Sequence, residues 1–96
     1  MSYSLILSLK AQEDIIESID WYNQGRENFG FEFYGRVSEK LALLVESSLH
    51  YSIRFKNIRT TLVRRFSYLI YFKINEKQTS IVILGVLHTS RDPKTI

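Results

Sequence analysis

The chain has 96 residues, 45% of them hydrophobic and 24% charged, which is typical of one globular domain with its own core. It has no cysteine, which excludes disulfides and thiolate catalysis, and its two histidines, His50 and His88, form no metal-binding motif with each other. The first residues lack the basic region and cleavage site of a signal peptide, and no apolar run is long enough to span a bilayer. We therefore expect a cytoplasmic protein without a membrane segment.

Charge is distributed unevenly along the chain, although the net charge is only +3. Residues 1–46 carry eight acidic and four basic side chains, whereas residues 47–96 carry nine basic and two acidic ones. The two halves therefore have formal charges of −4 and +7, and residues 47–75 contain no acid. Such a basic segment favours an anionic partner (a nucleic acid, a ribosome or an acidic protein segment) over a solvated surface without a partner.

The first part of the chain predicts a strand followed by a helix. Residues 3–7 are short and apolar, and from residue 9 the hydrophobic side chains recur at helical spacing. Ser8 is suited to cap this helix at its N-terminus, and Gly25 to end it. The apolar positions of the helix are Ala11, Ile15, Ile19 and Tyr22.

A second helix is expected over residues 26–48, completing a helical hairpin. Its apolar stripe consists of Phe29, Phe33, Val37, Leu41 and Leu44. Gly30 and Gly35 each lower the helix propensity by up to about 1 kcal/mol, and we expect them to allow a close approach to the first helix. Four aromatic residues of the hairpin are expected in the core rather than as stacking platforms for bases, namely Trp21, Tyr22, Phe29 and Phe33.

The second part of the chain changes to the period of two that is typical of strands. We expect an edge strand over residues 53–58, a strand over residues 60–66, and another over residues 68–75 whose even-numbered side chains share one face. A turn at residues 75–78 leads to a strand over residues 79–88, which is apolar on both faces and therefore predicted to be central. The order β-α-α-β-β-β, with a three- to four-stranded antiparallel meander, predicts one α+β domain over residues 1–96.

Several motifs extend over nearly the whole chain. They are Asp14-Ile15 and Trp21-Tyr22, Phe33, the segment Leu62-Val63-Arg64-Arg65-Phe66, the segment Tyr68-Leu69-Ile70-Tyr71-Phe72, and residues 83–93 with the sequence ILGVLHTSRDP. Together they resemble the RelE/ParE toxin superfamily and are most similar to its ParE, or plasmid-stabilisation, branch. The chain departs from that branch at Ser67, where proline is expected, and in the polar link over residues 47–51, which lacks a proline usual there.

The resemblance implies the toxin of a type II toxin–antitoxin system, held inactive by a cognate antitoxin whose C-terminal segment wraps around it. Within the superfamily, RelE-like members cut mRNA on the ribosome, and ParE-like members inhibit DNA gyrase. The resemblance implies no cofactor, no metal, no membrane and no small-molecule substrate.

A metal-free RNA-cleaving site needs a base for the 2′-hydroxyl group, cations for the phosphate and an acid for the leaving oxygen. If the chain is a nuclease, the residues available for these roles are Lys56, Arg59, Arg65, His88 and Arg91. This set is incomplete, because no tyrosine follows Leu87, where the RelE-like pattern has one. We therefore rank a non-enzymatic gyrase inhibitor first, a ribosome-dependent mRNA endonuclease second, and an inert member that only binds its antitoxin third.

The residues expected to bind partners are Arg54, Lys56, Arg59, Arg64, Arg65, Tyr71, His88 and Arg91. Arg64 and Arg65 are adjacent in a predicted strand, so their side chains should point to opposite faces. One of them is expected to pair with an acid of the first helix, such as Asp14 or Glu17.

Other roles remain open for several of these residues. A solvated or ion-paired structural cation is as good an interpretation of Arg64 and Arg65 as a partner contact. His88 is expected to be a hydrogen-bonded structural residue rather than a catalytic one. Arg91 and Asp92 are expected to organise the turn before Pro93.

Overall fold

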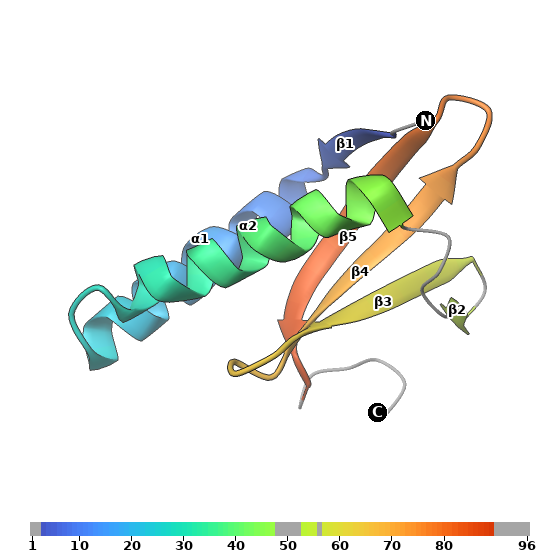
Figure 1. The fold of residues 1–96 in the computed structure, drawn as a ribbon. Coiled ribbons are helices and arrows are strands. Elements are labelled where there is room, and N and C mark those ends of the chain that lie inside the picture. Colours follow the sequence, from blue (N-terminus) through green and yellow to red (C-terminus); the bar gives the residue numbers. More distant parts are fainter. Residues whose placement is uncertain (1–2, 48–52, 56, 90–96) are drawn as a thin grey trace.

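In the computed structural model, which describes residues 3–47, 53–55 and 57–89, a helical hairpin packs on a five-stranded mixed sheet (Figure 1). The elements are β1 (Ser4–Leu7), α1 (Leu9–Gly25), α2 (Phe29–Ser47), β2 (Ile53–Phe55), β3 (Ile58–Val63), β4 (Tyr68–Asn75) and β5 (Ser80–His88). The strands lie in the order β1-β5-β4-β3-β2. The predicted α+β fold and element order are confirmed. No helix among the described residues is long and apolar enough to cross a membrane.

The first helix begins as predicted but ends differently. The Ser8 hydroxyl accepts a hydrogen bond from the Ala11 backbone N–H at 3.1 Å, which confirms Ser8 as the N-cap. Gly25, however, is still helical, and the cap is Arg26, whose backbone is extended and whose N–H donates to the Tyr22 carbonyl oxygen at 3.0 Å. The predicted glycine cap is therefore wrong. The chain reverses instead at Asn28, which has a φ of 66°.

The second helix begins at Phe29 and crosses α1 closely at one glycine. A Cβ at Gly30 would collide with the Ile19 carbonyl oxygen, and the Gly30 backbone N–H donates to the Asn23 side-chain oxygen at 2.7 Å. Nothing lies within 4 Å of a Cβ built at Gly35. The prediction of close approach is thus right for Gly30 and wrong for Gly35.

The sheet contains the predicted meander and one parallel pair. β2, β3, β4 and β5 pair antiparallel in sequence order, and β1 adds in parallel on the other side of β5, with Ser4 opposite Ser80. The strand predicted to be central therefore lies between β1 and β4. β2 is the edge strand at the opposite side of the sheet.

The connection from β3 to β4 differs from the prediction. β3 ends at Val63, and residues 64–67 form a turn in which Arg65 and Ser67 have φ angles of 79° and 54°. Arg64 and Arg65 are therefore turn residues, and the prediction that they alternate across a strand is wrong. The turn also accounts for the missing proline, because a proline ring holds φ near −65° and cannot take the angle of Ser67.

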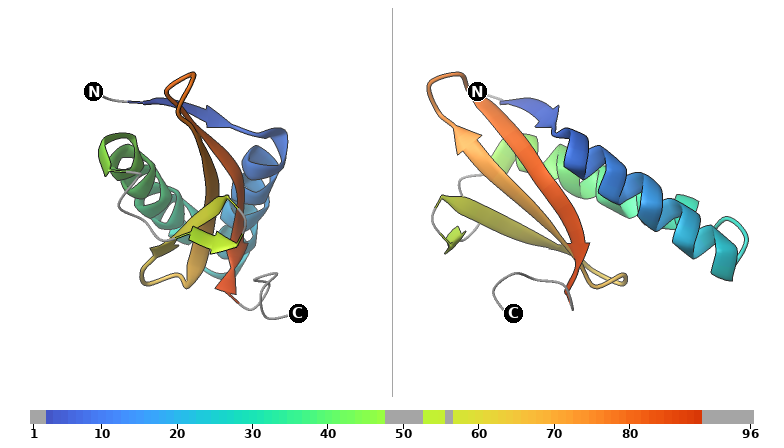
Figure 2. Two further views of the ribbon diagram at one scale, coloured as in Figure 1. Left: turned by 90° about the vertical axis from the view of Figure 1, so that its right-hand side faces the viewer. Right: turned by 180° about the vertical axis from the view of Figure 1, so that it is seen from behind.

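The core lies between the helices and one face of the sheet, and the predicted stripes supply it. Its buried members include Ala11, Ile15, Phe33, Val37, Leu41, Leu44, Val63, Ile70, Phe72, Ile81, Ile83 and Val86. Trp21 is an exception, because 66% of its surface is exposed, so its predicted place in the core is wrong. Figure 2 shows that the end of the helical hairpin projects past the β3–β4 turn.

Candidate functional site

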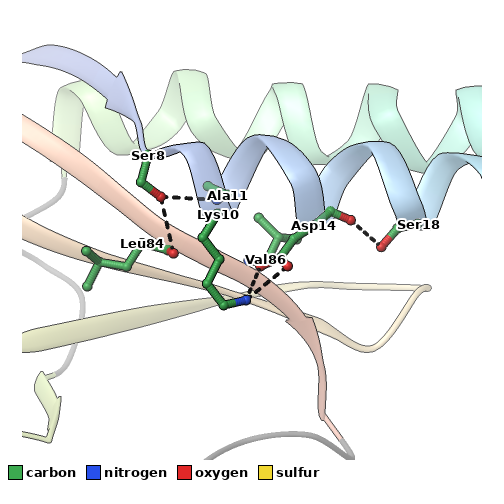
Figure 3. Close-up of polar contacts among 7 residues, drawn as sticks. All are labelled: Ser8, Lys10, Ala11, Asp14, Ser18, Leu84 and Val86. Atoms are coloured by element: carbon green, nitrogen blue, oxygen red, sulfur yellow. Dashed lines mark hydrogen bonds and ion pairs between the residues drawn. The ribbon is translucent and has the colours of Figure 1, made fainter.

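Residues of α1 fix the C-terminal half of β5 where β1 no longer pairs with it (Figure 3). Tyr71 pairs with Gly85 and Phe72 pairs with Ile83, so Leu84 is the extra residue of a β-bulge. The Ser8 hydroxyl donates to the Leu84 carbonyl oxygen at 3.3 Å, and the Asp14 carboxylate accepts from the Val86 backbone N–H at 3.0 Å. The N-cap residue Ser8 and the α1 residue Asp14 thus take the place of a neighbouring strand along this edge.

Asp14 holds the two elements together within a narrow space. A Cβ at position 85 would lie 3.1 Å from the Asp14 carboxylate, so glycine is what lets β5 approach the carboxylate this closely. The Lys10 ammonium group lies 3.0 Å from both oxygens of the same carboxylate. Both oxygens of Asp14 are therefore engaged within the fold.

A cavity of about 550 Å³ opens beside this contact, between α1 and the end of β5. It is lined by Asp14, Glu17, Ser18, Trp21, Tyr22, Tyr68, Val86, Leu87 and His88. His88 ends β5 and packs edge-on against Tyr68, with 5.3 Å between the ring centroids. The cavity therefore joins carboxylates to aromatic rings, and among the lining residues only His88 can carry positive charge.

Tyr22 stands at the centre of the aromatic side chains that support this cavity. Its ring centroid lies 5.0 Å from that of Trp21, 5.2 Å from that of Phe66 and 6.0 Å from that of Tyr68. Burial raises the pKa of Tyr22 to about 12, and the neighbouring Tyr68, which shares a hydrogen bond with it, adds to the increase. Tyr22 is therefore neutral at physiological pH and acts as a packing and hydrogen-bonding group.

A second hollow, of about 340 Å³, lies between α2 and the end of β3, and it is mostly basic. Its lining consists of Arg36, Glu39, Lys40, Leu43, Val63, Arg64 and Arg65. Arg65 lies 3.5 Å from Glu32, so it pairs with α2 and not with Asp14 or Glu17 as predicted. This correction follows from the turn, which directs Arg65 toward the hairpin end of α2. We call these seven residues the basic groove.

The predicted site residues do not converge on one place. Arg59 of β3 pairs with Phe72 and lines a hollow together with Lys73. It lies four residues before Val63 along β3, which corresponds to a distance of about 13 Å along the strand. Arg64 and Arg65 lie in the basic groove, and His88 lies in the cavity beside α1. Tyr71 is only 8% exposed and offers little surface to a partner.

The side chains of three expected site residues lie outside the part of the chain that the structure describes. Lys56 and Arg91 fall outside the described residues, as do Asp92 and Pro93. Arg54 belongs to β2, but its side chain is not among those described. Among residues 3–47, 53–55 and 57–89, no three His, Asp or Glu side chains are placed to hold a metal ion.

The sequence prediction missed Asp14 as a contact to β5, and Glu17 and Trp21 as walls of a cavity. A signal for Asp14 was present, since it lies three residues after Ala11 and four before Ser18, on the inner side of α1. The glycine at position 85, inside an apolar strand, was a second signal of close approach. Neither signal specifies that the two positions meet.

The comparisons with known proteins agree with this fold. The family model for the ParE toxin of the type II toxin–antitoxin system parDE matches residues 5–93. Among solved structures, a chain of the chromosomal ParDE system from P. aeruginosa has a TM-score of 0.80 at 18% identity, covering 91% of this chain and 96% of that one.

Two RelE structures are also similar. A double mutant of the E. coli toxin RelE in the free state has a TM-score of 0.72 at 13% identity, covering 96% of this chain and 88% of that one. The toxin–antitoxin complex RelBE2 from Mycobacterium tuberculosis has a TM-score of 0.61 at 17% identity, covering 94% of each chain. The search of curated proteins found no match. Because the family model covers nearly the whole sequence, the chain belongs to the family of ParE toxins of type II toxin–antitoxin systems.

Proposed function

We propose that this protein acts in the cytoplasm by inhibiting DNA gyrase through direct binding and that a cognate antitoxin neutralises it. The composition of the cavity around His88 is the main argument against RNA cleavage. Its ionisable neighbours include Asp14 and Glu17, whose charge repels a phosphate. Arg59 lies at the far end of the sheet, and Arg65 is paired with Glu32. Among the described residues of the possible nuclease set, Arg59, Arg65 and His88 therefore lie at three separate places.

For the antitoxin, we infer that acidic side chains contact the basic groove. The groove carries four cations against Glu39, and its floor includes the half-exposed Leu43. An amphipathic acidic segment would bury the apolar surface and neutralise the charge. Exposed cations of this kind contribute about 0–1 kcal/mol each to folding but more across an interface that excludes water.

Substitution of Arg64 tests the antitoxin contact. Arg64→Glu should leave thermal unfolding unchanged and weaken binding to the small protein encoded beside the toxin, which copurification and titration can measure. Lys77→Glu is the matched control, because it makes the same charge change in the β4–β5 turn, away from the groove. Equal affinity of both variants and the parent would contradict the groove as the antitoxin contact.

Growth experiments test the target. Induced expression should arrest growth and activate the DNA damage response, and coexpression of the antitoxin should prevent both effects. Primer extension on cellular mRNA supplies the rival readout. Codon-positioned cuts without DNA damage would favour the ribosome-dependent endonuclease and overturn the gyrase proposal.

A further inference from the structure

Two carboxylates line the cavity between α1 and β5, and one of them has no ion pair among the residues that the structure describes. Asp14 is engaged by Lys10 and by the Val86 backbone N–H. Glu17, one helical turn further along α1, makes no ion pair with any of the described residues and is exposed to solvent. The cavity therefore presents a negative group at its rim, and His88 is the one lining residue that can carry positive charge.

Aromatic rings form the wall next to this carboxylate. Trp21 follows Glu17 by four residues on the same side of α1, is 66% exposed, and packs edge-on against Tyr22 with centroids 5.0 Å apart. Tyr22 is itself in contact with Tyr68, which also lines the cavity. Exposing an indole to water at this position has no evident benefit for folding.

A carboxylate beside an exposed indole side chain selects for a particular ligand chemistry. Phosphate and carboxylate groups are repelled by Glu17, and an uncharged apolar group would leave it desolvated. A cation is attracted both by the carboxylate and by the negative faces of the rings. The planar guanidinium of arginine fits better than an ammonium group, because it can stack on an indole while it donates two hydrogen bonds to one carboxylate.

We propose that this cavity is the receptor for an arginine side chain carried by the cognate antitoxin. The inference rests on the antitoxin half of the proposed function and does not depend on gyrase. Charge complementarity supports it. Acidic side chains of an antitoxin suit the basic groove, but they do not suit α1, where Glu13, Glu17 and Asp20 are exposed. An antitoxin that reaches both surfaces would therefore need a base here, and the volume of about 550 Å³ is ample for one side chain.

The fluorescence of Trp21 provides a direct test, because it is the one tryptophan in the chain. The free toxin is titrated at constant ionic strength with N-acetylarginine methylamide, and separately with the uncharged citrulline analogue and the lysine analogue. The arginine compound should give a saturable change in the millimolar range. The citrulline analogue should give none and the lysine analogue a weaker one, whereas equal binding of either analogue would contradict the guanidinium assignment.

Substitutions on α1 then locate the site and the source of the arginine. Glu17→Gln should weaken binding of the arginine compound by about tenfold, the equivalent of one charge-assisted hydrogen bond, whereas Glu13→Gln should not change it. Glu17→Lys, with a normal thermal melt, should lower antitoxin affinity, and Glu13→Lys should not. Unchanged affinity of Glu17→Lys would overturn the proposal. Gyrase inhibition by the same variant is measured in parallel, so a failure here is distinct from a failure of the gyrase proposal.

Discussion

At the scale of single residues, Asp14 is a side chain that joins α1 to β5 directly. It lies on α1, yet its carboxylate accepts a hydrogen bond from the Val86 backbone N–H of β5, beyond the residues of β5 that pair with β1. Its side chain is only 12% exposed, so water does not readily replace the contact. Losing it leaves a largely buried donor without a partner, which costs more than the hydrogen bond itself contributes.

We therefore expect Asp14→Ala to destabilise the protein by about 1–3 kcal/mol in urea unfolding. Asp14→Asn should cost less, because its amide oxygen can still accept from the Val86 N–H. Asp20→Ala, at an exposed position of the same helix, is the control and should change stability little. Equal stability of the Asp14 and Asp20 alanine variants would show that this contact does not hold α1 to β5.

The raised pKa of Tyr22 should make the free energy of unfolding depend on pH. Its pKa in the folded protein is about 12, against 10.0 for an unperturbed tyrosine, so the folded state retains this proton to higher pH than the unfolded state does. The corresponding stabilisation is complete below pH 10 and is lost as the pH rises toward 12. The free energy of unfolding should fall over this interval, and Tyr22→Phe should reduce the slope. An identical slope in that variant would rule out Tyr22 as the titrating group.

At the scale of elements, we expect alanine substitutions at the two glycines of α2 to change stability in opposite directions. Gly30→Ala should destabilise the protein by about 1–3 kcal/mol, because its methyl group would force α2 away from the Ile19 carbonyl oxygen. Gly35→Ala meets open space and should stabilise it by up to about 1 kcal/mol through helix propensity. Thermal or urea unfolding of both variants decides the matter, and a gain in stability at Gly30 would refute the close helix crossing.

The β3–β4 turn gives a second prediction at this scale. Ser67→Pro should destabilise by more than about 1 kcal/mol, because the ring cannot adopt a φ of 54°. Ser67→Gly allows that angle and should be nearly neutral. If the proline variant is as stable as the parent, the left-handed conformation at this position is not required by the fold.

The elements also show what a sequence can and cannot predict. The stripe from Phe29 to Leu44 and the alternation from Tyr68 to Ile74 follow from periodicity, because one face of each is buried in the core. The turn at residues 64–67 could not be predicted, because Arg65 and Ser67 take left-handed angles that glycine or asparagine normally marks. The candidate site could not be predicted for another reason. The contact between Asp14 and Val86 joins residues 72 positions apart, and no local pattern specifies it.

At the scale of the whole molecule, folding divides the charges over separate surfaces. The basic groove gathers cations from α2 and from the β3–β4 turn, and Arg59 and Lys73 form another basic area at the far end of the sheet. The exposed side of α1 is acidic. A charge reversal at Arg59 would therefore test a surface different from the basic groove.

The proposed inhibition of gyrase by direct binding can be tested with purified components. The most direct measurement is DNA supercoiling by purified gyrase, with increasing toxin, and with toxin preincubated with its antitoxin. We expect the toxin to inhibit supercoiling at concentrations near stoichiometric with gyrase, and we expect the antitoxin to restore it. Full supercoiling in the presence of excess folded toxin that still binds its antitoxin would contradict the claim.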